Sequence, residues 1–113
     1  MTSEFERIQV ETPPEDDRIQ IIRLDHNERD NVIDERMVLE LYAALEDADV
    51  DADVDGILLG TTAETFCAGA DLTEIKEHDV EDGGRFLTGY FEMMDLLRET
   101  GKPVVAAVEG NCV

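Results

Sequence analysis

Two short apolar runs, each preceded by an amphipathic segment, restrict this chain to a layered fold. The runs are GILLGT at 56–61 and PVVAAVEG at 103–110, and both have the length and aliphatic content of buried strands. Buried strands that are joined by crossover helices favour a parallel sheet covered by helices. We therefore expect the fold class α/β.

The two predicted helices are recognised by apolar residues that recur every three or four positions. The first begins at Asp34, and its apolar face carries Val38, Leu41, Tyr42, Leu45 and Ala48. The second runs from Gly83 to Thr100 and is ended by Gly101 and Pro103. Its apolar face carries Phe86, Tyr90, Met93, Met94 and Leu97.

Two further strands are predicted at the N-terminus. FERIQVET at 5–12 alternates apolar and polar residues, and RIQIIRLD at 18–25 follows after the turn PPEDD at 13–17. The short connection predicts that these strands pair antiparallel. The expected order is β-β-α-β-α-β, with no domain boundary inside residues 1–113.

The charge of the chain excludes some partners. Hydrophobic residues make up 42% of the sequence, so a core is expected, but 29 acids against 9 bases give a net charge of −20. Such a chain repels nucleic acid and anionic membranes. Only Lys76 and Lys102 are lysines. Acid excess with scarce lysine resembles proteins of salt-loving organisms, and the alternative is a mimic of nucleic acid's negative surface.

The cysteines and the N-terminus predict a cytoplasmic protein. Cys67 and Cys112 lie far apart in the sequence without CxxC spacing, which fits a reducing compartment better than a disulfide scaffold. The segment MTSEFERIQV has no basic and no apolar region of a signal peptide. No apolar run approaches membrane-spanning length.

The acidic run EDADVDADVD at 46–55 matches the first half of a calcium loop through Asp51, Asp53 and Asp55. The closing position falls on Thr62, where a bidentate Glu is required, so we expect a solvated helix end and no metal site.

The two histidines, His26 and His78, lie in polar segments. Neither has a Ser, Cys or carboxylate at a spacing typical of catalysis, so we expect both at the surface.

The segment FCAGADL places Cys67, Ala68, Gly69 and Ala70 side by side, after a buried strand and before a helix that Asp71 begins. Amide groups at a helix N-terminus stabilise negative charge, and small side chains let a ligand approach the backbone. A tight turn that needs small residues only for packing explains the same pattern. The residues alone leave both interpretations open.

Three segments together resemble the enoyl-CoA hydratase/isomerase family, also called the crotonase family. They are IIRLDHNERDNVID, FCAGADLTEI and GKPVVAAVEGNCV, in the family's order and at its spacing. The resemblance implies the N-terminal portion of a crotonase-type ββα spiral, the ClpP/crotonase-like fold. Residues 1–113 would then be a single, incomplete domain.

The resemblance also implies a function. Family members bind acyl-coenzyme A and hold the oxygen of a thioester enolate between two backbone N–H groups, one of which corresponds to Ala70. They have no permanently bound cofactor or metal, they serve fatty acid metabolism as lyases or isomerases, and they commonly form trimers or hexamers. The resemblance implies that coenzyme A is bound by the residues at the family's motif positions, which are Arg29, Ala68, Gly69, Ala70, Asp71, Leu72 and Thr73.

The sequence departs from the family pattern at a few positions. His26 and Asn27 replace an Arg-Pro pair, and Thr73 stands where many relatives carry a Lys that reaches phosphate. We expect Asp71 to cap a helix rather than to catalyse, and Cys67 to pack rather than to act as a nucleophile.

The resemblance does not supply a complete catalytic set. In the family, the glycine-rich turn with the second oxyanion N–H and the acid–base carboxylates follow the position of Val113, and Glu109 precedes that turn. The alternative function is therefore a catalytically inactive truncated fragment or an acidic interaction protein. The matched residues do not choose between hydration, isomerisation, hydrolysis and decarboxylation.

Overall fold

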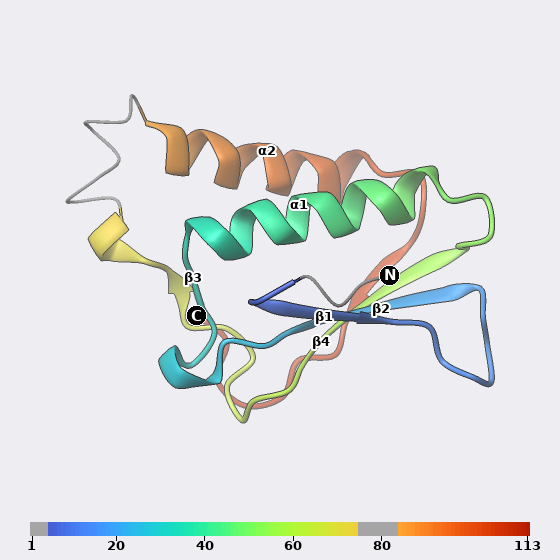
Figure 1. Ribbon diagram of the computed structural model, residues 1–113, viewed down its shortest axis with the longest axis horizontal. Helices are drawn as coiled ribbons and strands as arrows, with labels where there is room; N and C mark the ends of the chain where they lie inside the picture. The colour runs from blue at the N-terminus through green and yellow to red at the C-terminus, as the bar shows by residue number, and fades with distance from the viewer. Residues whose placement is uncertain (1–4, 75–83) are drawn as a thin grey trace.

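The fold is a four-stranded sheet with two helices on one side of it (Figure 1). A computed structural model describes residues 5–74 and 84–113. The sheet order is β1-β2-β4-β6; β1 pairs antiparallel with β2, and the other neighbours pair parallel. The bounds are β1 Ile8–Glu11, β2 Ile19–Leu24, α1 Glu35–Val50, β4 Gly56–Thr61, α2 Arg85–Glu99 and β6 Val104–Ala106. This order confirms the expected α/β class and the antiparallel N-terminal pair.

A second, smaller sheet lies at the end of the molecule where β2 and β4 terminate. It consists of β3, Val32–Ile33, paired parallel with β5, Gly69–Ala70. A single 3-10 turn, η1, spans Asn27–Arg29 and precedes β3. Both segments of this small sheet connect the main strands to the helices, so the sheet fixes the loops in which the predicted site residues lie.

The core forms because α1 and α2 present their apolar faces to each other and to the sheet. Asp34 caps α1, as predicted, and its side chain accepts a hydrogen bond from the Met37 N–H at 2.9 Å. The predicted face of α1 is buried, except that Tyr42 is half-buried. On α2, Phe86 and Met93 are buried, whereas Met94, which also belongs to the predicted apolar face, is 42% exposed. Among the described residues, no helix has the length and apolarity to cross a membrane.

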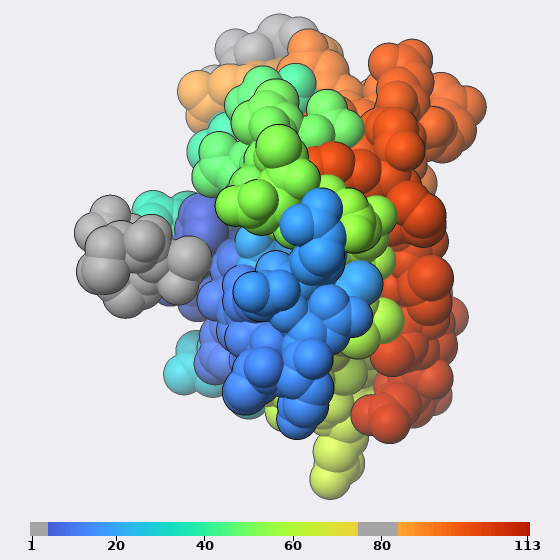
Figure 2. Space-filling view, turned by 90° about the vertical axis from the view of Figure 1, so that its right-hand side faces the viewer, coloured from blue at the N-terminus to red at the C-terminus, as the bar shows by residue number. Residues whose placement is uncertain are grey.

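The run at 103–110, predicted as a buried strand, is strand only at Val104–Ala106 and is largely exposed. Val104 packs against the core, whereas Val105 is 60% exposed and Val108 is 53% exposed. Val105 is exposed because β6 is the last strand of the sheet and both helices cover the face opposite to this side chain. Figure 2 shows the C-terminal segment, in red, along one flank of the molecule.

The surface charge predicts that the fold depends on salt. Seven arginines already contact a carboxylate: Arg7, Arg18, Arg23, Arg29, Arg36, Arg85 and Arg98. With 29 acids in the chain against 9 bases, most carboxylates are left to repel one another. The Debye length falls from about 10 Å at 0.1 M salt to about 3 Å at 1 M, so salt screens this repulsion.

We therefore expect the helical circular dichroism signal and the melting temperature to rise across a KCl series from low to molar concentration. Sucrose at matched osmolality is the control, because it leaves the charges unscreened. Equal signal and equal melting temperature at both ends of the KCl series would contradict the prediction.

Candidate active site

The segment that carries Ala70 is held between two neighbouring stretches of backbone. On one side, the Ala68 N–H donates to the Asn31 carbonyl at 3.4 Å and the Asp71 N–H to the Ile33 carbonyl at 2.9 Å. On the other side, the Cys67 carbonyl accepts from the Val113 N–H at 2.9 Å. The backbone of residues 66–71 is therefore fixed from both sides.

The N–H of Ala70 points away from β3. Ile33 pairs with Ala70 in register, and it is the next amide, that of Asp71, that donates to Ile33. Successive N–H groups of an extended strand point to opposite sides, so the Ala70 N–H points away from β3. This direction keeps the Ala70 amide out of the β3 pairing, just before the turn that Asp71 begins.

Gly69 lets the strand bend at this point. Its φ of +94° lies in the region that favours glycine, and a Cβ placed there would lie 3.5 Å from the Val113 carbonyl oxygen. A larger side chain would strain the backbone directly before the amide of Ala70.

Asp71 fixes the start of the following turn. Its side chain, in a residue only 3% exposed, accepts from the Thr73 N–H at 3.0 Å, the Thr73 hydroxyl at 2.6 Å and Arg29 Nη1 at 2.9 Å. Burial alone would raise the pKa of Asp71, but these hydrogen bonds outweigh it and lower the pKa below its usual value. The expected capping role of Asp71 agrees with these contacts.

The structure brings most of the matched residues together. Arg29 reaches the segment through Asp71, and its side chain remains 49% exposed. The side chains of Leu72 and Thr73 are exposed, and that of Leu72 is 69% exposed. Most of the helix predicted after Asp71 falls on residues outside the described ranges, and His78 also lies outside them.

Replacing Asp71 with Asn is expected to destabilise the fold by about 1–3 kcal/mol near neutral pH, because it removes a buried ionised acceptor. Since the folded-state pKa is lowered, the ionised form contributes stability above the unfolded pKa of about 3.9, and this contribution is lost as pH falls through the folded pKa. Urea unfolding midpoints of both proteins at several pH values would measure the difference.

The difference between the two proteins should be constant above about pH 5 and should shrink below about pH 4. Asp95→Asn is the matched control, because Asp95 pairs with Arg98 at the surface and little change is expected. A difference for Asp71→Asn that does not vary with pH would contradict the role assigned to the carboxylate.

Asn31 is a structural residue of the site that the sequence did not single out. It is fully buried, and its side-chain amide donates to the Thr61 hydroxyl at 2.7 Å and to the Thr65 carbonyl at 3.0 Å. Its φ of 58° is one that Asn tolerates better than most residues. Asn31 thus joins the loop before β3 to the segment before Ala70.

His26 is buried, so its expected surface position is wrong. It is 8% exposed, and its N–H donates to the Asn31 side chain at 2.6 Å, which draws the loop inward. Its Nδ1 lies 3.9 Å from Asp34 Oδ2 and has no hydrogen-bond partner among the described residues.

Cys67 is a packing residue, as expected. It is buried in the core cluster, its Sγ accepts from the Gly69 N–H at 3.3 Å, and burial raises the pKa of its thiol. A raised thiol pKa is opposite to what a nucleophile needs.

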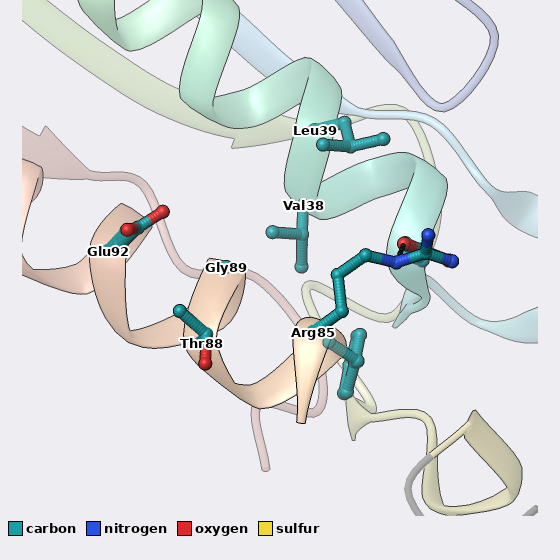
Figure 3. Close-up of a pocket in the computed structure, with 8 residues that line it drawn as sticks. Val38, Leu39, Arg85, Thr88, Gly89 and Glu92 are labelled. Atoms are coloured by element: carbon teal, nitrogen blue, oxygen red, sulfur yellow. Dashed lines mark hydrogen bonds and ion pairs between the residues drawn. The ribbon is translucent and has the colours of Figure 1, made fainter. Parts of the chain in front are cut away.

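Two cavities lie beside the helices, and Ala70 lines neither of them. The larger, of about 500 Å³, is a groove between α1 and α2 in which Arg85 Nε pairs with Glu35 at 2.7 Å (Figure 3). The smaller, of about 230 Å³, is apolar and has both Cys67 and Cys112 in its lining. None of the coenzyme-binding residues that the family resemblance implies lines either cavity. The candidate site therefore rests on the backbone geometry around Ala70.

Gly110 holds the 111–113 segment against the site, and its replacement by Ala is expected to cost at least about 1–3 kcal/mol of stability. Its φ is +74°, and an added Cβ would lie 1.8 Å from the Glu64 carbonyl oxygen, so the two backbones would have to move apart. Gly101→Ala is the matched control, since a Cβ there would meet nothing within 4 Å. Equal unfolding midpoints for the two variants would contradict the prediction.

Comparison with known proteins identifies relatives along most of the chain. The family model described as enoyl-CoA hydratase/isomerase matches residues 15–113. A protein of Rhizobium meliloti named "Probable enoyl-CoA hydratase" is 32% identical over 106 residues, which cover 94% of this chain and 39% of that protein. The chain thus spans about 39% of the length of this curated relative.

Solved structures agree with the fold. An enoyl-CoA hydratase/isomerase from Xanthobacter autotrophicus superimposes with a TM-score of 0.83 at 29% identity, over 96% of this chain and 40% of that one. A structure titled as a probable enoyl-CoA hydratase from Mycobacterium thermoresistibile gives a TM-score of 0.78 at 31% identity, over 94% of this chain and 42% of that one. These matches confirm the expected fold class, the N-terminal portion of a crotonase-type ββα spiral.

Proposed function

The chain belongs to the enoyl-CoA hydratase/isomerase family, and from this membership we propose that it acts on acyl-coenzyme A as part of a complete domain. By complete domain we mean this chain followed by the part of its relatives' length that it does not span. The observation that carries the proposal is the direction of the Ala70 N–H, which points away from β3.

The proposed chemistry is stabilisation of an enolate. The thioester oxygen of the substrate accepts the Ala70 N–H, and this hydrogen bond strengthens as negative charge develops on the oxygen. A second N–H and the acid–base carboxylates come from the remainder of the complete domain. Because residues 66–71 are held by hydrogen bonds on both sides, the donor needs little reorganisation during the reaction.

Coenzyme A is proposed to bind along Ala68–Thr73. The backbone carbonyls of Ala68 and Ala70 accept from the adenine amino group, and the exposed part of the Arg29 guanidinium faces the phosphates. Arg29 is already oriented by Asp71 at 2.9 Å, which supports this placement. In a chain whose net charge is −20, this arginine supplies local positive charge that the polyanionic coenzyme requires.

The setting proposed for the complete domain is a salt-rich cytoplasm, in fatty acid metabolism, as a homo-oligomer of three or six copies. Exposed apolar side chains on α1 and α2 support an assembly, among them Leu39 and Phe91.

The experiment is hydration of crotonyl-coenzyme A by the complete domain at high salt, followed by loss of the conjugated thioester absorbance. Mass spectrometry of the products then separates hydration from isomerisation, hydrolysis and decarboxylation of suitable thioesters. Absence of turnover together with absence of coenzyme A binding would reject the proposal and favour a non-catalytic interaction protein.

A further inference from the structure

The two cysteines, distant in sequence, are direct neighbours across two extended segments. Cys67 and Cys112 form a parallel backbone bridge. The Cys67 N–H donates to the Asn111 carbonyl at 3.2 Å, and the Val113 N–H donates to the Cys67 carbonyl at 2.9 Å, so Cys112 is bracketed by both bonds. Neighbouring strands lie about 4.8 Å apart, which is inside the Cα separation of about 4.4–6.8 Å that a disulfide requires.

Their side chains also lie on the same side. Directly paired residues of neighbouring strands project to one face, and both cysteines belong to the lining of the apolar cavity of about 230 Å³. Cys67 is buried and Cys112 is exposed, and both are free thiols in this structure. Cys67 is therefore shielded by the core, whereas Cys112 lies beside it without being packed into the core of the described residues.

We propose that Cys67 and Cys112 are a reversible dithiol–disulfide pair that closes when the protein meets a peroxide. The Cys112 thiolate attacks the peroxide, its sulfur becomes a sulfenic acid, and the O–O bond breaks with release of water or an alcohol. The Cys67 sulfur then attacks the Cys112 sulfur, and the S–S bond forms as the S–O bond breaks and a second water leaves. Two thiols are oxidised and one peroxide is reduced.

Burial supports this order of events. Because the pKa of the Cys67 thiol is raised by its surroundings, this thiol does not react first with an external oxidant. The first step therefore falls to its neighbour, Cys112.

The cross-link would join the segment that carries Ala70 to the segment paired with it. Cys67 lies three residues before Ala70, and Cys112 lies on residues 111–113, which are hydrogen-bonded to Cys67. If the proposed function holds, closure of the disulfide fixes the distance between the Ala70 N–H and the part of the domain that approaches it, and turnover becomes sensitive to oxidation.

The test is peptide mapping of the complete domain after treatment with hydrogen peroxide, under native conditions and at high salt. Trypsin cleaves after Arg36, Lys76 and Arg98, so Cys67 falls in peptide 37–76 and Cys112 in a peptide that begins at Glu99. We expect these two peptides to appear linked, with a mass lower by two hydrogens than their sum, and to separate with dithiothreitol. The readout is a mass, so it does not depend on catalysis.

Single variants and an unfolded control make the outcome specific. Cys112→Ser should leave Cys67 unmodified, and Cys67→Ser should leave Cys112 as a sulfenic or sulfinic acid with no linked peptide. Native protein in which peroxide over-oxidises Cys112 without any linked peptide would overturn the proposal. Linkage that forms equally fast in urea-unfolded protein would also overturn it, because the pairing would then owe nothing to the fold.

Discussion

Removing the N–H group of Ala70 from the complete domain is expected to lower kcat by about 10²–10³-fold, which corresponds to about 2.7–4 kcal/mol of lost transition-state stabilisation. Ala70→Pro deletes this one donor and keeps a small side chain. The neighbouring amide of Asp71, which donates to Ile33, is left in place. The measurement is turnover of crotonyl-coenzyme A, after circular dichroism has shown that the variant is folded.

Ala70→Gly is the matched control, since it keeps the N–H and should leave kcat nearly unchanged. Proline can strain the bend at Gly69, so a second variant in which the amide of Ala70 is replaced by an ester removes the donor without a ring. A folded Ala70→Pro or ester variant with undiminished turnover would reject Ala70 as the oxyanion donor.

Local patterns in the sequence predicted the main elements because each pattern is stabilised by burial of one face. The helical spacing of apolar residues on α1 and the cap at Asp34 appear in the structure as predicted. The strand Gly56–Thr61 does so as well. Both features depend on residues a few positions apart, so no knowledge of distant contacts was required.

Features that depend on distant contacts were not predictable in this way. His26 lies in a polar segment but is buried, because Asn31 binds its backbone and connects the loop to Thr61 and Thr65. Val105 lies in an apolar run but is exposed, because both helices cover the opposite face of the sheet. The pairing of Cys67 with Cys112 likewise follows from strand order and not from spacing.

The candidate site lies between these cases. Physical reasoning on FCAGADL left a tight turn and an anion-binding backbone equally open, and the choice of Ala70 came from family resemblance. The structure adds the direction of its N–H, which follows from the register of β3 with β5. That register depends on residues far from the motif, so the motif alone could not supply it.

A polypeptide limited to residues 1–113 is expected to show turnover near background. By the family pattern, its single candidate donor at Ala70 lacks a partner, and no carboxylate occupies an acid–base position. Acid–base catalysis contributes about 10²–10⁴-fold and one oxyanion donor about 10²–10³-fold, so the combined loss should exceed that of any single substitution.

The same polypeptide is expected to associate, because β6 offers an unpaired edge and the exposed Val105, and the segment after β6 exposes Val108. Light scattering and size-exclusion chromatography at high salt would measure its state beside the activity assay. The complete domain under identical conditions is the control. Turnover by residues 1–113 that matched the complete domain would mean that this polypeptide carries its own acid–base group, and the exposed Glu109 would be the first side chain to replace.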